Sequence, residues 1–172
     1  MPKIIIDKKA QESPYRIVGD QEVESGHLIL PLATWLDRRE ALAERNDLGV
    51  WLDAHEEAEA LAGLVNRLPV IALNFPAFYD GRSLSNATIL RRQLGYRGEL
   101  RAVGDVRCDQ LDQMQRCGIN AFELAPGQDT TQALEALAGF TYSYQGSVDQ
   151  PEPLFRAKQR GAAAPIRRQA SS

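Results

Sequence analysis

Short apolar runs alternate with helix-like stripes along most of this chain, and that alternation restricts the folds open to it. The runs Leu48–Leu52 and Val70–Phe75 have the length and pattern of strands that are buried on both faces. Between them, from residue 58 to residue 68, apolar residues recur at three- and four-residue spacing, as on one face of a helix. Repeated strand–helix units with short connections favour a parallel sheet with helices packed against it.

The same pattern predicts the order of elements. We expect strands at residues 4–6, 28–30, 48–52, 70–75, 99–103 and 121–124, with a further strand at 141–144. We expect helices over residues 32–42, 58–68, 87–94, 111–115 and 133–140. The fold class is therefore α/β, with a mostly parallel sheet of five to six strands and flanking helices. An open, doubly wound sheet is the first expectation and a partial TIM-like barrel the alternative, because a closed barrel of this type needs about 250 residues.

The composition changes near Gly146. Residues 1–145 are predicted to form one α/β domain, and residues 146–172 a flexible basic tail rich in Pro and Ala. The tail carries five basic residues against two acidic ones. Such a segment is typical of a solvated, mobile end, and a partner-docking arm is the alternative.

Charge and motif content exclude several classes of protein. A net charge of -3 gives no overall attraction for nucleic acid or an anionic membrane. No apolar stretch approaches the ~18 residues that a membrane helix needs, and the apolar start is too short for a secretory signal. We therefore expect a cytoplasmic protein. The chain lacks the glycine-rich motifs for dinucleotides and nucleoside triphosphates and the nucleophile elbow, so no cofactor is predicted.

Cysteine and histidine are too scarce for a metal centre. The chain has Cys108 and Cys117, whose spacing places them on opposite sides of a helix, and two separate histidines, His27 and His55. Iron–sulfur clusters and structural zinc need more ligands than these can bring together. We expect no metal site, and we interpret both cysteines as small buried hydrophobic residues. His55 is expected to be a surface residue.

Three aromatic residues, Phe75, Phe78 and Tyr79, lie where the central strand ends and its loop begins. A solvated loop gains nothing from exposing aromatic rings, so they must pack under the loop, line a pocket or meet a partner. The carboxyl end of a central strand is also where open α/β sheets bind ligands. This loop is therefore the first candidate for a ligand or partner site.

Polar residues of the same loop suit an anion. Ser83 or Ser85 is expected to cap the following helix, which would place Arg82 beside free backbone N–H groups. An arginine at that position favours an anion. The alternative is structural, with Asp80 and Arg82 only bracing the loop.

A second set of polar residues follows the next strand. Asp105 falls at the strand end, where it can cap the following helix, and Asp109 and Gln110 come shortly after it. If the two strands are neighbours, Asp80 and Asp105 could share a crevice and divide acid and base roles. Arg101, inside an apolar strand, needs a carboxylate or anion partner.

The stretch from residue 75 to residue 118 contains a distinctive set of residues: Phe75, Pro76, Phe78, Asp80, Gly81, Arg82, Arg91, Gly104, Asp105, Asp109, Gln110, Arg116, Cys117 and Gly118. With these residues the stretch resembles domain-of-unknown-function family 934, and the similarity extends over most of residues 1–145. Members are often labelled as oxidoreductases of sulfite reduction. The resemblance implies a setting in bacterial sulfur assimilation, beside the sulfite reductase haemoprotein. The family has no agreed catalytic residues, so none is carried over.

Three functions remain open at this point. The first is an accessory protein of assimilatory sulfite reduction that acts with the sulfite reductase haemoprotein, because side chains alone do not supply the electrons for sulfite reduction. The second is a small enzyme or sensor that binds an anion with the loops around Arg82 and Asp105. The third is a homo-oligomeric structural or interaction domain whose aromatic loop is the subunit interface.

Overall fold

The computed structural model describes residues 3–19, 25–77 and 80–139. Its strands are β1 (Lys3–Ile6), β2 (Lys9–Glu12), β3 (Arg16–Ile17), β4 (Leu28–Pro31), β5 (Leu48–Leu52), β6 (Val70–Phe75), β7 (Glu99–Gly104) and β8 (Ala121–Phe122). Its α-helices are α1 (Leu32–Asp37), α2 (Arg82–Arg92), α3 (Leu111–Arg116) and α4 (Thr130–Ala138). Three short 3₁₀ helices are η1 (Ala58–Leu61), η2 (Val65–Arg67) and η3 (Cys108–Gln110).

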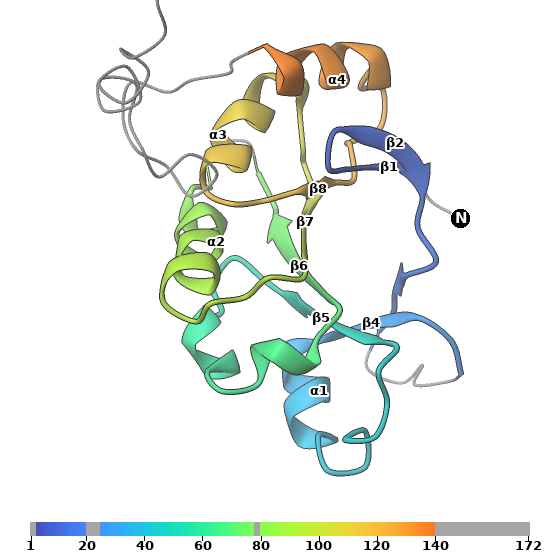
Figure 1. The fold of residues 1–172 in the computed structure, drawn as a ribbon, viewed down its shortest axis with the longest axis vertical. Coiled ribbons are helices and arrows are strands. Elements are labelled where there is room, and N and C mark those ends of the chain that lie inside the picture. The colour runs from blue at the N-terminus through green and yellow to red at the C-terminus, as the bar shows by residue number, and fades with distance from the viewer. Residues whose placement is uncertain (1–2, 20–24, 78–79, 140–172) are drawn as a thin grey trace, which may run out of the picture.

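All of these strands form one curled sheet in the order β2-β1-β8-β7-β6-β5-β4-β3. The strands from β3 to β8 run parallel, and β1 is antiparallel to both β2 and β8. The four α-helices lie along the outside of the curve (Figure 1). The molecule is thus an α/β half-barrel.

The expectation of a doubly wound sheet is therefore wrong, and the partial-barrel alternative describes the fold. A doubly wound sheet needs a point where the strand order reverses, so that helices cover both faces. Here each crossover from β4 onwards moves one place in the same direction, and right-handed crossovers then leave every helix on the same face.

The sheet also has more strands than the five to six expected. The additional β2 has only exposed residues and β3 has two residues, so neither carries an apolar pattern. These two strands lie at opposite edges of the sheet but are consecutive in sequence, joined by residues 13–15. An extended chain spans at most about 3.5 Å per residue, so the edges lie within roughly 14 Å of each other at this link. Figure 1 shows the N-terminal segment passing from the β1–β2 hairpin across the open side of the curve to β3, which pairs with β4.

Apolar residues fill both faces of the sheet. The large core lies on the outer face, under the helices, and includes Leu30, Val50, Leu73 and Leu100. A smaller cluster on the inner face consists of Ile29, Val70, Ala72 and Val103, with Tyr15 and Trp51 packed against it. Because side chains alternate along a strand, Arg101 also points to the inner face, where it lies opposite Ala72.

Most of the expected helices are confirmed, although two regions differ. The helix expected over 58–68 is two 3₁₀ turns separated at Gly63, whose φ of +75° no α-helix permits. The helix expected over 32–42 ends at Asp37. Cys108 and Cys117 are only half-buried, are not joined in a disulfide and pack against the outer core. No described helix is long and apolar enough to cross a membrane. The strand expected at 141–144 and the basic tail lie outside the described residues.

Gly49 permits the close approach of three strands. A Cβ atom at this position would lie 2.3 Å from Val70 Cγ1 and 2.7 Å from the Val70 carbonyl oxygen. We predict that Gly49→Ala lowers the free energy of unfolding by about 1–3 kcal/mol, as overpacking of a tight core does. Urea denaturation measures the change. The control is Gly19→Ala, because a Cβ atom there would meet nothing within 4 Å; equal stability of the two variants would contradict this packing.

Candidate functional site

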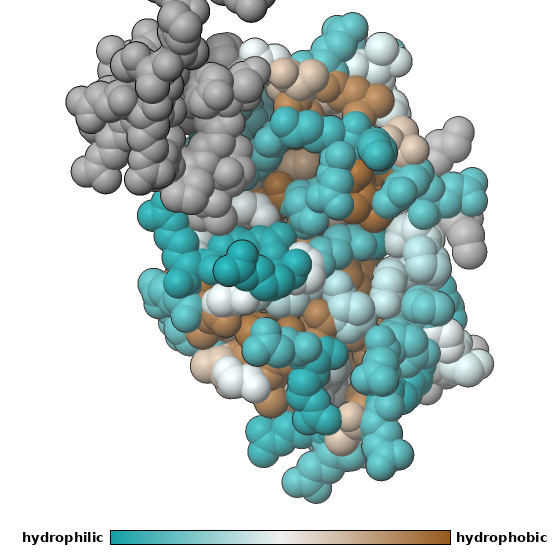
Figure 2. Space-filling model, in the orientation of Figure 1, coloured by the Kyte–Doolittle hydropathy of each residue, from teal (hydrophilic) through white to brown (hydrophobic). Residues whose placement is uncertain are grey.

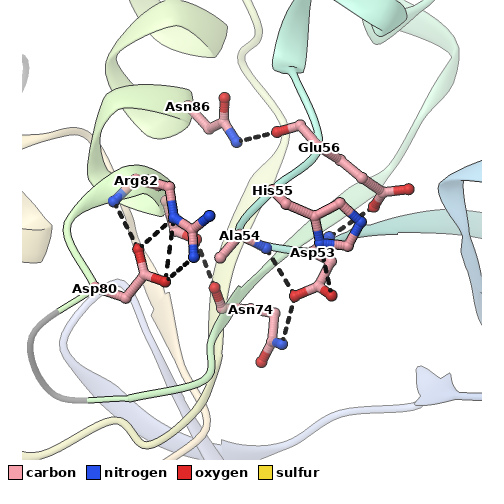
Figure 3. Close-up of polar contacts among 9 residues, drawn as sticks. Asp53, Ala54, His55, Glu56, Asn74, Asp80, Arg82 and Asn86 are labelled. Atoms are coloured by element: carbon pink, nitrogen blue, oxygen red, sulfur yellow. Dashed lines mark hydrogen bonds and ion pairs between the residues drawn. The ribbon is translucent and has the colours of Figure 1, made fainter.

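Polar side chains gather at the rim of the half-barrel where β5 and β6 end (Figure 3). The inner-face row that starts with Trp51 and Ala72 continues to Asp53 and Asn74, two residues further along each strand. Asn74 Nδ2 donates a hydrogen bond to Asp53 Oδ1 at 2.9 Å. The apolar interior of the half-barrel therefore ends in a polar rim, in the position where barrel enzymes carry their active sites.

Asp53 is the centre of this rim. Its Oδ1 also accepts from the Ala54 backbone N–H at 2.7 Å, and its Oδ2 lies 3.1 Å from His55 Nδ1. The hydrogen bond from Asn74, with that from the Ala54 N–H, lowers the pKa of Asp53 below its usual value. Asp53 is thus a carboxylate at neutral pH. The His55 side chain is 70% exposed, as expected for a surface residue.

Hydrogen bonds from side chains to the backbone hold the rim in place. Ser83 Oγ donates to the Asn74 carbonyl oxygen, which fixes the start of α2 against the end of β6. Asn86 donates to the Glu56 carbonyl at 2.8 Å and accepts from the Ala58 N–H at 3.2 Å. Gly104 approaches so closely that a Cβ atom would lie 2.8 Å from Asn74 Oδ1, and its φ is +97°. Only glycine suits that position.

Asp80 and Arg82 form an ion pair with each other. Arg82 Nε and Nη2 donate to the two Asp80 carboxylate oxygens at 2.9 and 2.6 Å, and the Arg82 backbone N–H donates to Oδ1 at 3.1 Å. These bonds lower the pKa of Asp80 to about 2. The loop is thus braced as the structural alternative expected. The prediction that Ser83 or Ser85 caps α2 is wrong, because the N-cap is Gly81 and Asp80 accepts the first free N–H.

The same arrangement recurs at the end of β7. Arg107 Nε and Nη2 donate to the Asp105 carboxylate at 2.9 and 3.0 Å. Asp105 does not occupy the N-cap of η3, which is Arg107, whose N–H donates to Gln110 Oε1 at 3.3 Å. Asp109 lies exposed in η3. Each of the neighbouring strands β6 and β7 is therefore followed by an Asp-x-Arg pair, a repeated motif that sequence reasoning missed.

The remaining candidates lie away from this rim. Phe75 is buried in the outer core with 2% exposure, so it packs under the loop, whereas Phe78 and Tyr79 lie outside the described residues. Arg101 is fully buried on the inner face of β7. Its Nε donates to Glu99 Oε1 at 2.7 Å and its Nη2 to Ser13 Oγ, which confirms the expected carboxylate partner. Its Nη1 is buried and has no hydrogen-bond partner among the described residues.

Two residues of the rim were not identified as site residues from the sequence. Asp53 and Asn74 hold the cluster together, and an asparagine inside an apolar strand is the feature that could have identified it. In the part of the chain that the structure describes, no three His, Cys, Asp or Glu side chains gather as metal ligands. The rim thus offers an oriented carboxylate–imidazole pair flanked by two carboxylate–guanidinium pairs.

The Asp80–Arg82 pair predicts a specific titration. Replacing Arg82 by Gln removes the guanidinium bonds to Asp80 and leaves the backbone N–H bond, so the pKa of Asp80 should rise from about 2 towards its ordinary value of about 3.9. In the native protein the pKa of Asp80 is lower in the folded state than in the unfolded state, so the ion pair stabilises the fold at pH values above the unfolded-state pKa. This stabilisation is lost as the pH falls through the folded-state pKa. The variant should not show this pH-dependent loss of stability. Carboxyl carbon NMR titration measures the pKa, with Arg92→Gln as the control. An unchanged Asp80 pKa in Arg82→Gln would show that the pair is not formed in solution.

The buried Arg101–Glu99 pair predicts a rescue experiment. Arg101→Met leaves the mostly buried Glu99 carboxylate, which is 18% exposed, without its cationic partner, and we expect it to lower the free energy of unfolding by roughly 3 kcal/mol. Adding Glu99→Gln removes the uncompensated charge and should restore much of the loss. Thermal and urea denaturation of the single and double variants measure both effects. A single variant as stable as the native protein would contradict the burial of this pair.

Comparison with known proteins shows the family to which this chain belongs. No curated protein matches the chain. A family model described as a bacterial protein of unknown function (DUF934) matches residues 49–155, which is more than half of the chain. The matched region contains the rim residues of β5 and β6 together with both Asp-x-Arg pairs. The chain belongs to the DUF934 family, as its resemblance indicated.

Proposed function

We propose that this protein is an accessory component of bacterial assimilatory sulfite reduction that acts with the sulfite reductase haemoprotein. The observation that carries the proposal is the family membership, because the resemblance implies a setting beside that haemoprotein. The proposal assigns the electron-transfer chemistry to the partner, since the hard redox steps belong to cofactors.

The rim geometry supports a binding role. Arg82 and Arg107, the arginines that flank the carboxyl ends of β6 and β7, are each bound through two nitrogens to a neighbouring carboxylate. A small anion would have to displace that carboxylate, so an enzyme or sensor acting through Arg82 and Asp105 has less support. A protein partner can instead bind against the two Asp–Arg ion pairs without breaking them, since the rims of protein interfaces are polar.

The aromatic loop is the proposed contact for the haemoprotein. Phe75 anchors the start of the loop in the core, and Phe78 and Tyr79 follow it in sequence. Aromatic residues are enriched where protein interfaces bind most strongly. The same loop is the interface in the alternative proposal, a homo-oligomeric interaction domain.

Capture from native bacterial lysate tests the proposal. The tagged chain of residues 1–172 should co-elute with a protein that shows the visible absorption of sirohaem and that mass spectrometry identifies as the reductase. Replacing both Phe78 and Tyr79 by Ser should remove the partner, because it deletes two aromatic anchors.

The matched control is Ile17→Ser, which makes the same apolar-to-polar change at an exposed position on β3. Retention of the partner by that control is expected. Elution of the native chain alone and colourless would contradict the accessory function. If the chain then self-associates with increasing concentration, the homo-oligomer is favoured.

A further inference from the structure

A second site lies at the opposite end of the sheet from the polar rim. A cavity of about 250 Å³ opens where β5 begins, between α1 with the turns that follow it and the segment around η2. Its lining comes from α1, the turns after it, the start of β5 and the residues around η2. An engineered apolar cavity of about 150 Å³ is enough to bind benzene. This one therefore has room for a small organic molecule.

The floor of the cavity is apolar and belongs to the core. Trp35, Leu48 and Leu68 are buried members of the outer core, and Leu42 and Leu64 pack against them. An indole ring beside leucine side chains binds the flat or branched body of a ligand through burial and dispersion. A ligand for this floor must have an apolar part.

The mouth of the cavity is basic. Arg39, Arg45 and Arg67 line it against one acidic residue, Glu40. Asp47 neutralises Arg45, which donates to it through Nε and Nη2, both at 2.8 Å. Among the described residues, no carboxylate lies within ion-pair distance of Arg39 or Arg67.

The cationic groups at the mouth are partly held in place. Arg67 Nη2 donates to the Ala43 carbonyl at 2.7 Å, which links the two walls of the cavity. Arg45 Nη2 donates to the Gly26 carbonyl at 2.9 Å as well as to Asp47. A carbonyl oxygen does not compensate a charge, so Arg67 keeps its attraction for an anion. Figure 2 shows that hydrophilic side chains dominate this end of the face in view, over α1 and the turns after it.

We propose that this cavity is a binding site for a small amphipathic anion: an apolar body of one or two rings or a branched chain, carrying one carboxylate or sulfonate group. The body lies on Trp35 and the leucines, and the charged group meets Arg39 and Arg67. The site is separate from the rim and from the partner loop, so it stands or falls independently of the accessory function.

Fluorescence titration with anilinonaphthalene sulfonate tests the site. This probe has an apolar ring system and one sulfonate, and phenylnaphthylamine is its neutral counterpart without the sulfonate. The chain has two tryptophans, so Trp51→Phe leaves Trp35 in the cavity as the only tryptophan donor when tryptophan is excited selectively. We expect saturable one-to-one binding of the sulfonate with quenching of Trp35, and about tenfold weaker binding of the neutral probe, as for loss of a charge-assisted contact.

Two variants separate the site from general hydrophobic binding. Replacing Arg39 and Arg67 together by Gln should weaken sulfonate binding about tenfold and leave binding of the neutral probe unchanged. Arg92→Gln, which removes an exposed arginine outside the cavity, should change neither. Circular dichroism of each variant checks that it is folded. Equal affinity for the two probes, or full sulfonate affinity in the double variant, would overturn the proposal.

Discussion

The buried guanidinium of Arg101 joins the centre of the sheet to the segment that crosses its open side. It lies on β7 in the middle of the inner face, bound to Glu99 on its own strand and to Ser13 in the link between β2 and β3. The contact with Ser13 joins residues 88 positions apart in sequence. Because the link connects the two edge strands, one side chain ties the open side of the sheet to its centre.

That closure determines where chemistry is possible. With the inner face filled by apolar residues and the Arg101 pair, the polar side chains of β5 and β6 emerge only at the carboxyl rim. There Asp53 is held by Asn74, and Asp80 by Arg82, in contacts that stabilise the ionised carboxylates. The rim is consequently charged but internally compensated, because these carboxylates have partners within the rim.

The sequence was most informative where apolar patterning decides the structure. The strands β4 to β8 and the helices α2 to α4 follow from runs and stripes of apolar residues. β2 and β3 did not, because their exposed residues pair only through the backbone. The choice between a doubly wound sheet and a half-barrel depends on strand order, which apolar patterning does not encode. For the site, residue types identified Asp80, Arg82 and Asp105, but only the structure showed that each carboxylate is paired with the arginine two residues on.

Amide hydrogen exchange along residues 13–18 tests the central claim, that the chain itself closes the open side of the sheet. Two backbone N–H groups of this segment donate hydrogen bonds to β4 or to the residue before it. Arg16 N–H donates to the His27 carbonyl at 3.1 Å, and Val18 N–H donates to the Ile29 carbonyl at 3.1 Å. If the closure is a stable part of the fold, both amides should be protected to nearly the same degree as those of β5 and β6. Exchange of these two amides at the rate of an unstructured chain, with the rest of the sheet protected, would contradict the account.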